Sequence, residues 1–367
     1  MLKISGINAI LSLLAGALAG CGGDSAGVCQ AVAGSGNVKL GSVQGELNHS
    51  DGACRNPGLV TLTDGHLLAS YECNGAVIYS QLSADGGTTW SGLVAAYTPA
   101  PGYAIGLTNL TMMMSGQIWL TFDDMPNSGS NELTAIAGVP NALDEITWTS
   151  RMVASYDGSE WSGGCWSGGP VVELKNGSLL WPAYCMTSPS ANRTSTVLRS
   201  SDAGKSWIQV IVGNAAADGR DYDESALAVM PCGDVVMIMR NTENLSADIV
   251  GTYWRSVSAD GGLSWSAPVE AANVTDVSRP TLAVLPGGGL VLMGRALLNG
   301  MEGATGFATS WDEGRTFTAF ADLGVTGPAL GWDQYDAMSA LPDGTIAVVT
   351  THGTGTVNID YRSLVAP

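Results

Sequence analysis

The sequence has little positive charge and almost no histidine. Lysine and arginine together number 15 among 367 residues, against 33 aspartates and glutamates, so the formal net charge at pH 7 is −18. A chain this acidic repels nucleic acid and anionic membrane surfaces, which excludes both as expected partners. Only three histidines are present, His49, His66 and His352, and no cluster of cysteine and histidine appears. The sequence therefore predicts no metal site.

The N-terminal apolar stretch, residues 7–19, falls short of a membrane span. It is too short for a stable transmembrane helix, but it suits the apolar core of a signal peptide and follows Lys3. It ends in Leu-Ala-Gly-Cys at 18–21, which resembles a bacterial lipobox. We expect a signal peptide over 1–20, a lipid anchor on Cys21, a flexible tether over 21–37 and one domain over 38–367. The alternative, an ordinary secretory signal, would change the anchor but not the export. With either signal we expect an exported protein, located in the cell envelope at the outer membrane or cell surface, or secreted.

Cysteine is scarce, but its positions fit an exported protein. Seven cysteines minus the lipidated one leave six, an even number. Cys54 and Cys73 flank one predicted pair of strands, and Cys165 and Cys185 hold the matching places in another. Each pair should meet at one end of its hairpin, so we predict the disulfides Cys54–Cys73 and Cys165–Cys185. Two cysteines are left over, and their pairing is open: Cys29 and Cys232.

Glycine, by contrast, is abundant, with 49 residues, and it recurs in four copies of one turn. The copies follow the pattern S-x-D-x-G-x-[ST]-[WF] and lie at residues 83–90, 200–207, 258–265 and 310–317. In each, the aspartate can accept hydrogen bonds from backbone N–H groups two or three residues on, the glycine supplies a positive φ, and the closing aromatic ring can pack beneath the turn. We call these four segments the Asp turns and expect their aspartates to be structural. A worn fifth copy keeps Asp144 and Trp148.

A second repeat, two apolar runs around a glycine turn, recurs six times at intervals of 51 to 61 residues. Its central glycines are Gly65, Gly116, Gly177, Gly233, Gly288 and Gly344. Two strands, then a third strand, an Asp turn and a fourth strand make one propeller blade. The expected fold is all-β, a six-bladed β-propeller of four-stranded antiparallel blades, rather than a sandwich. The last repeat has no Asp turn, so residues 38–48 are expected to supply its outer strand and close the ring.

The Asp turn resembles the Asp-box, or BNR repeat, of the sialidase-like β-propellers, and the likeness covers most of residues 50–364. Three segments carry it: CRNPGLVTLTDGHLLASYE from position 54, ESALAVMPCGDVVMIMRN from 224 and YDAMSALPDGTIAVV from 335. The resemblance implies that Arg55 and Arg240 bind a substrate carboxylate and that Glu72 steadies Arg55. It also implies that Glu224 lies beside the nucleophile, Tyr335.

These residue types suit that chemistry. The planar guanidinium of arginine binds a carboxylate through two parallel hydrogen bonds. A tyrosine phenol, with a pKa of about 10, becomes a nucleophile when a neighbouring carboxylate takes its proton. Sialidases use such a tyrosine where most glycosidases use a second carboxylate. Glu224 is therefore the expected base for Tyr335.

Two residues that the resemblance implies are missing. The family carries its acid/base aspartate between the second and third strands of the first blade, and here that loop is only Cys-Asn-Gly at 73–75. Asp123 or Asp124 is the expected substitute, and Asp221 and Asp223 are further candidates. The family's third arginine would lie near residues 301–303, which read Met-Glu-Gly. Two arginines at the same end of the fifth blade are expected to compensate: Arg279 and Arg295.

The sequence thus predicts a sialidase-like exo-glycosidase that removes terminal, acidic sugars from glycoconjugates, without a cofactor and as a monomer. Three alternatives remain open: a glycosidase for another sugar, a polysaccharide lyase with Tyr335 as base, and a non-catalytic propeller that binds glycans or protein. Retention of Glu224 and Tyr335 favours an enzyme, whereas the missing aspartate favours a binding protein.

Overall fold

The computed structural model describes residues 39–47, 54–127, 131–140, 145–242, 252–275, 279–285, 287–298, 301–323, 335–341, 345–352 and 358–365. The expected signal peptide, the tether, Cys21, Cys29 and Asp144 lie outside the described residues. The one described helix, α1 (Ala215–Asp218), is a single turn. None of the described helices is long and apolar enough to cross a membrane.

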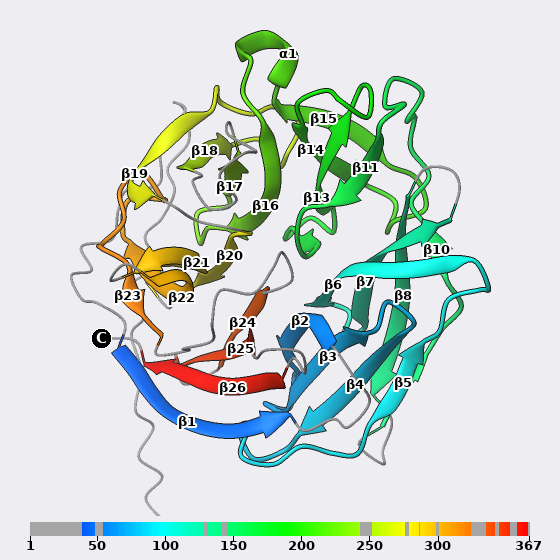
Figure 1. The fold of residues 1–367 in the computed structure, drawn as a ribbon, viewed down its shortest axis with the longest axis vertical. Helices are drawn as coiled ribbons and strands as arrows, with labels where there is room; N and C mark the ends of the chain where they lie inside the picture. Colours follow the sequence, from blue (N-terminus) through cyan, green and yellow to red (C-terminus); the bar gives the residue numbers. More distant parts are fainter. Residues whose placement is uncertain are drawn as a thin grey trace, which may run out of the picture.

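The described strands form six antiparallel sheets, which Figure 1 shows arranged around a common centre. The first sheet comprises β2 (Cys54–Thr61), β3 (Leu67–Cys73), β4 (Val77–Ser83) and β5 (Val94–Tyr97). The second comprises β6 (Tyr103–Met112), β7 (Ile118–Pro126), β8 (Glu132–Pro140), β9 (Ile146–Trp148) and β10 (Met152–Val153). The third comprises β11 (Gly164–Ser167), β12 (Val172–Glu173), β13 (Leu179–Met186), β14 (Thr194–Ser200) and β15 (Ile208–Gly213).

The second half of the chain continues the same pattern. The fourth sheet comprises β16 (Tyr222–Val229), β17 (Val235–Asn241), β18 (Thr252–Ser258) and β19 (Val269–Thr275). The fifth comprises β20 (Thr281–Val284), β21 (Leu290–Leu298), β22 (Met301–Ser310) and β23 (Ala321–Asp322). The sixth comprises β24 (Asp336–Ala340), β25 (Ile346–His352), β26 (Asn358–Val365) and β1 (Lys39–Leu47). The architecture is an all-β propeller built from antiparallel blades, as the repeat predicts.

The outer strand of the sixth sheet comes from the other end of the domain. Strand β1 pairs antiparallel with β26, from Lys39 opposite Val365 to Leu47 opposite Ile359. This confirms the prediction that a segment before the first repeat completes the last sheet. The pairing covers a sheet edge that would otherwise offer unpaired backbone groups to other chains.

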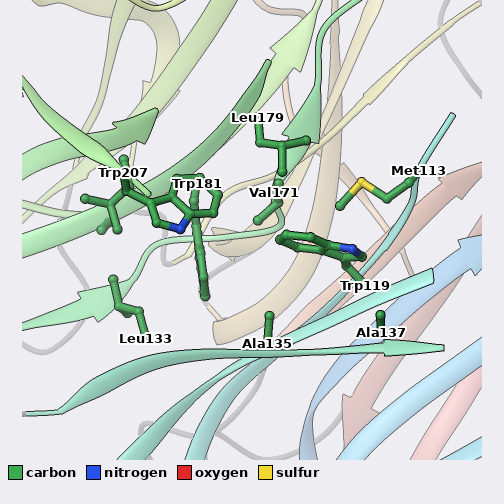
Figure 2. Close-up of a cluster of buried hydrophobic side chains, with 11 residues drawn as sticks. Met113, Trp119, Leu133, Ala135, Ala137, Val171, Leu179, Trp181 and Trp207 are labelled. Carbon is green, nitrogen blue, oxygen red and sulfur yellow. The ribbon is translucent and has the colours of Figure 1, made fainter. Parts of the chain in front are cut away.

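Six hydrophobic clusters fill the spaces between neighbouring sheets, one between each pair around the ring. Figure 2 shows the cluster between the second and third sheets, where Trp119 and Met113 face Val171, Leu179 and Trp181. The Trp181 and Trp207 rings meet edge to face, with centroids 5.8 Å apart. Burial of these large apolar faces is the main favourable contribution to the free energy of folding. The inner strands are consequently held rigidly at the centre.

The four Asp turns share one hydrogen-bond pattern. In the turn at 200–207, the Asp202 carboxylate accepts bonds from the Ser206 backbone N–H at 2.9 Å and from the Ser206 hydroxyl at 2.6 Å. The aspartates of the other three turns accept the same pair of bonds. The shared backbone donor lies four residues on, one residue further than the local pattern predicts. Gly204, with a φ of 83°, packs against Trp119 of the preceding sheet, so the turn also fixes the contact between sheets.

Candidate active site

The innermost strands all begin at one end of the ring, and the second strands end there, as the topology predicts. Arg55 at the start of β2 lies opposite Glu72 near the end of β3, and Tyr222 at the start of β16 lies opposite Asn241 at the end of β17. We call this end the mouth. Polar side chains from several sheets gather at it, and the Asp turns connect third to fourth strands at the opposite end.

One contact at the mouth joins Tyr335 and Glu224. The Tyr335 hydroxyl, directly before β24, donates a hydrogen bond to Oε1 of Glu224 in β16. The other carboxylate oxygen of Glu224 accepts a 3.0 Å bond from Nη1 of Arg240 in β17. Glu224 is buried and Tyr335 is half-buried. The structure thus brings together three residues that the sequence predicts at one site, with the carboxylate between the phenol and the guanidinium.

A second group of charges adjoins Glu224. Nη1 of Arg193 donates to Asp221 at 3.2 Å, to Asp223 at 2.6 Å and to the Thr242 hydroxyl at 2.9 Å. Burial, together with the negative charge of Glu224, raises the pKa of Asp223 to about 7. Burial alone would lower the pKa of Arg240, but the Glu224 and Asp223 carboxylates raise it above its usual range. Arg240 is therefore a cation at neutral pH.

Arg279 reaches the centre of the mouth from the segment before β20. Its Nη2 donates a hydrogen bond to Oδ1 of Asn109 in β6, and its guanidinium carbon lies 5.1 Å from the centroid of the Tyr335 ring. That geometry is a cation–π contact. Arg279 is 5% exposed, and its Nη1 has no hydrogen-bond partner among the residues that the structure describes. A buried donor without a partner is costly, so this nitrogen is a candidate ligand-binding atom.

The two aspartates expected to replace the missing acid have different surroundings, because neighbouring residues of β7 point to opposite faces of the sheet. Asp123 is fully buried, and its Oδ1 accepts a 2.9 Å bond from the Ser167 backbone N–H, while Oδ2 has no partner among the described residues. Burial raises the pKa of Asp123 to about 8, although the Ser167 N–H and the positive charge of Arg279 act in the opposite direction. Oδ2 of Asp124 accepts 2.8 Å bonds from Tyr97 and Arg151.

Three predicted residues remain: Arg55 and Glu72, which form a described pair, and Arg295. Nε of Arg55 donates to Oε1 of Glu72, and the Gly75 N–H donates to Oε2 at 2.7 Å. Arg55 keeps about a third of its side chain exposed, 34%, whereas Glu72 is fully buried. The structure thus places Glu72 in direct contact with Arg55. Arg295 belongs to β21, but its side chain lies outside the described residues, as does that of Glu302.

Both predicted disulfides are present in the structure. Cys54 bonds to Cys73 at the mouth end of the β2–β3 pair, and Cys165 bonds to Cys185 at the same end of β11 and β13. Cys232 is also disulfide-bonded. Its sulfur approaches the carboxylates of Asp234 and Glu313. A disulfide sulfur is not a thiolate ligand, so this group of three has only two metal-ligating side chains.

The sequence prediction missed several residues at the mouth, among them Arg193, Tyr184 and Asn109. Arg193 precedes β14, and the start of a third strand lies at the same end as the start of the first, so the topology could have placed it. Tyr184 stacks on Trp166 with centroids 5.7 Å apart. Burial, with the nearby charges of Asp223 and Glu224, raises the pKa of Tyr184 well above its ordinary value. Asn109, the partner of Arg279, carries no sequence signal.

The structure is similar to solved β-propellers at low sequence identity. A protein of unknown function from Dyadobacter fermentans superimposes with a TM-score of 0.69 and 15% identity, over 87% of this chain and 96% of that one. The NanB sialidase from Streptococcus pneumoniae gives a TM-score of 0.64 and 13% identity, over 88% and 70%. A Trypanosoma rangeli sialidase in complex with the inhibitor DANA gives 0.59 and 13%, over 90% of this chain but only 59% of that one.

Neither a protein-family model nor a curated protein matches the sequence. At 13–15% identity the structural likeness shows the fold, a sialidase-like β-propeller, and no more. The chemistry has to be argued from the residues at the mouth.

Proposed function

We propose that this protein is a sialidase-like exo-glycosidase that hydrolyses terminal acidic sugars of glycoconjugates. The observation that carries the proposal is the hydrogen bond from the Tyr335 hydroxyl to Glu224, with Arg240 bound to the other carboxylate oxygen. We take each of the six sheets as one blade of a six-bladed propeller, with the Asp turns as Asp-boxes at the end opposite the mouth.

The first step forms a covalent intermediate. The Tyr335 oxygen attacks the anomeric carbon while Glu224 takes the phenol proton, since a phenol is a weak nucleophile until its proton is removed. The bond from the anomeric carbon to the leaving-group oxygen breaks, and that oxygen receives a proton from an acid. In the second step water attacks the same carbon, the acid's carboxylate takes the water proton, and Tyr335 leaves and regains its proton from Glu224. Two inversions give retention of configuration.

Asp123 is the best candidate for the acid. A pKa of about 8 keeps its carboxyl protonated at neutral pH, and no described residue forms a hydrogen bond with its Oδ2. Asp124 also has one oxygen, Oδ1, without a partner among the described residues, but it is less suitable because its Oδ2 is already bound to Arg151 and Tyr97. Asp223 also has a raised pKa, but Arg193 holds its Oδ2 at 2.6 Å.

The cations of the mouth suit an acidic substrate. Within the described part of the chain, Nη1 of Arg279 and Nε of Arg240 are buried donors without a hydrogen-bond partner, so each is available to donate to a substrate carboxylate. Arg55 is the third proposed contact, held by Glu72 and partly exposed to solvent. Arg295 is the fourth, on its position in β21 alone. We also propose that the protein is a monomer exported to the cell envelope, and that Cys21 carries its lipid anchor.

Turnover of 4-methylumbelliferyl α-sialoside by the mature chain tests the enzyme proposal. We expect release of methylumbelliferone, with NMR showing that the sugar is first released as the α-anomer. An unsaturated product would instead show lyase chemistry. A folded sample that releases no product, yet binds sialosides, would contradict the hydrolase and support a glycan-binding propeller, which the missing aspartate at 73–75 also favours.

A further inference from the structure

The bond between Arg279 and Asn109 crosses the mouth, joining residues 170 positions apart. Arg279 precedes β20 of the fifth sheet, and Asn109 belongs to β6 of the second. We propose that Asn109 is a positioning residue that holds the Arg279 guanidinium over Tyr335 with a neutral acceptor, so that the positive charge of Arg279 remains available to an acidic group of the substrate. The inference rests on the proposed function, which it deepens.

The backbone around Asn109 fixes the orientation of its amide. Strand β6 carries an irregularity in its pairing with β7 between Gly106 and Asn109, where Leu107 has a φ of 50°. Nδ2 of Asn109 donates a 2.9 Å bond to the Leu107 carbonyl. Since the amide nitrogen is committed to this carbonyl, Oδ1 is the atom that faces Arg279. A leucine with a positive φ is strained, so the fold stabilises this bulge by other contacts.

One such contact comes from the first sheet. The Thr108 hydroxyl, fully buried, donates to the backbone carbonyl of Asn56 in β2, where Asn56 itself has a φ of 52°. Two irregular strands therefore brace each other directly beside Asn109. This places the Asn109 amide on a rigid support, as a positioning residue requires.

The partners of Arg279 set it apart from the other described arginines at the mouth. Those arginines pair with carboxylates: Arg55 with Glu72, Arg151 with Asp124 and Glu132, Arg193 with Asp221 and Asp223, and Arg240 with Glu224 and Asp223. Arg279 instead binds a neutral amide and a tyrosine ring. The Asp123 carboxyl is close enough to interact with Arg279 electrostatically, and its pKa of about 8 leaves it uncharged at neutral pH.

This difference has a chemical consequence. A guanidinium that already faces a carboxylate attracts a second anion less strongly than one that faces a neutral amide. Asn109 thus acts on the substrate through Arg279. An aspartate in place of Asn109 would have nearly the same shape but would neutralise the charge of Arg279. The Asn109→Asp variant therefore separates the effect of charge from the effect of packing.

Three variants test the inference: Asn109→Asp, Asn109→Ala and a matched control, Asn176→Asp. Asn176 lies in the exposed turn between β12 and β13, and its Oδ1 accepts a 3.0 Å bond that an aspartate can also accept. Two probes, DANA and its uncharged methyl ester, are titrated into each folded protein by calorimetry, and thermal unfolding confirms that each variant is folded. We expect the wild-type protein to bind DANA, the acid, more tightly than its methyl ester. Asn109→Asp should weaken acid binding by about tenfold or more and leave ester binding nearly unchanged.

The other outcomes are equally informative. We expect Asn109→Ala to lower the acid-to-ester preference by less than Asn109→Asp does, because it releases Arg279 without neutralising it, and Asn176→Asp to keep the wild-type ratio. An unchanged ratio in Asn109→Asp overturns the inference, as does a wild-type protein that binds both probes equally or neither. Should Asn109→Asp not fold, Arg279→Gln takes its place: the acid preference must then disappear. Sialoside turnover is measured separately, so a protein that prefers the acid but hydrolyses nothing would contradict the enzyme proposal and leave this inference intact.

Discussion

The hydroxyl of Tyr335 donates a hydrogen bond to Glu224, although 111 positions separate the two residues in the chain. One residue precedes the inner strand of the sixth sheet, and the other lies near the start of the inner strand of the fourth. Their contact requires the ring to be closed, since each strand reaches the centre only by packing against its neighbours. The pair therefore links the fold of the whole chain to the chemistry proposed for it.

Removal of either partner should abolish turnover. Tyr335→Phe deletes the nucleophilic oxygen, and Glu224→Gln removes the base while preserving the shape of the side chain, so each should lower kcat for a fluorogenic sialoside by about 100-fold or more. The matched control is Tyr79→Phe, in β4 of the first sheet. Equal losses in all three variants, or full activity in Tyr335→Phe, would contradict the assigned roles.

Asp123 should make the protein less stable at high pH. Its pKa is about 8 in the folded chain and about 3.9 in an unfolded one, so between these values the native state holds a proton that the unfolded state has released. The contribution of Asp123 to the free energy of unfolding therefore falls as the pH rises from about 4 to about 8. Asp123→Asn should become more stable relative to wild type across this range, by about 1.4 kcal/mol per pH unit at most.

Urea unfolding at pH 5 and pH 8 measures this difference. Asp64→Asn is the control, because the Asp64 side chain is 53% exposed in a turn at the opposite end of the first sheet. A difference between Asp123→Asn and wild type that does not change with pH would show that the buried carboxyl has no raised pKa.

Loss of the disulfide at the mouth of the first sheet should affect both stability and binding. Cys54 and Cys73 lie 19 positions apart, and replacing both by alanine should lower the free energy of unfolding by about 2–5 kcal/mol. The adjacent pair, Arg55 and Glu72, is held by the same cross-link, so KM for an acidic sugar should rise as well. The Cys165→Ala/Cys185→Ala variant is the comparison. Equal KM values in the two double variants would show that the first disulfide does not position Arg55.

The glycine of an Asp turn should be irreplaceable where it touches the preceding sheet. A Cβ on Gly204 would lie 2.4 Å from Cη2 of Trp119, whereas a Cβ on Gly233 would meet nothing within 4 Å. Both residues have a positive φ, 83° and 104°, so both alanine variants carry backbone strain. The clash should make Gly204→Ala less stable than Gly233→Ala by about 1–3 kcal/mol in urea unfolding. Equal stabilities would mean that the turn moves freely against Trp119.

Features with a local signal could be predicted from the sequence, and those that depend on long-range packing could not. The period of the repeat predicts the two disulfides and the closing strand β1. It also predicts that Arg55, Glu224 and Tyr335 lie at the same end of their sheets. Asn109 could not be found this way, because only the bulge at Leu107 turns it toward Arg279. The different surroundings of Asp123 and Asp124 likewise depend on residues from other sheets, Ser167 for one and Tyr97 for the other.

The pairing of β1 with β26 also sets the order in which the chain can fold. Every other sheet consists of one continuous segment and can form as soon as that segment is available, whereas the sixth needs residues from both ends of the domain. Such a distant pairing carries a large loop-closure entropy and is intrinsically slow. The cluster that joins the sixth sheet to the first waits for the same event, and Leu47 of β1 lies inside it. Closure of the ring is thus expected to be the rate-limiting step of folding, and until it occurs two sheet edges stay open to other chains.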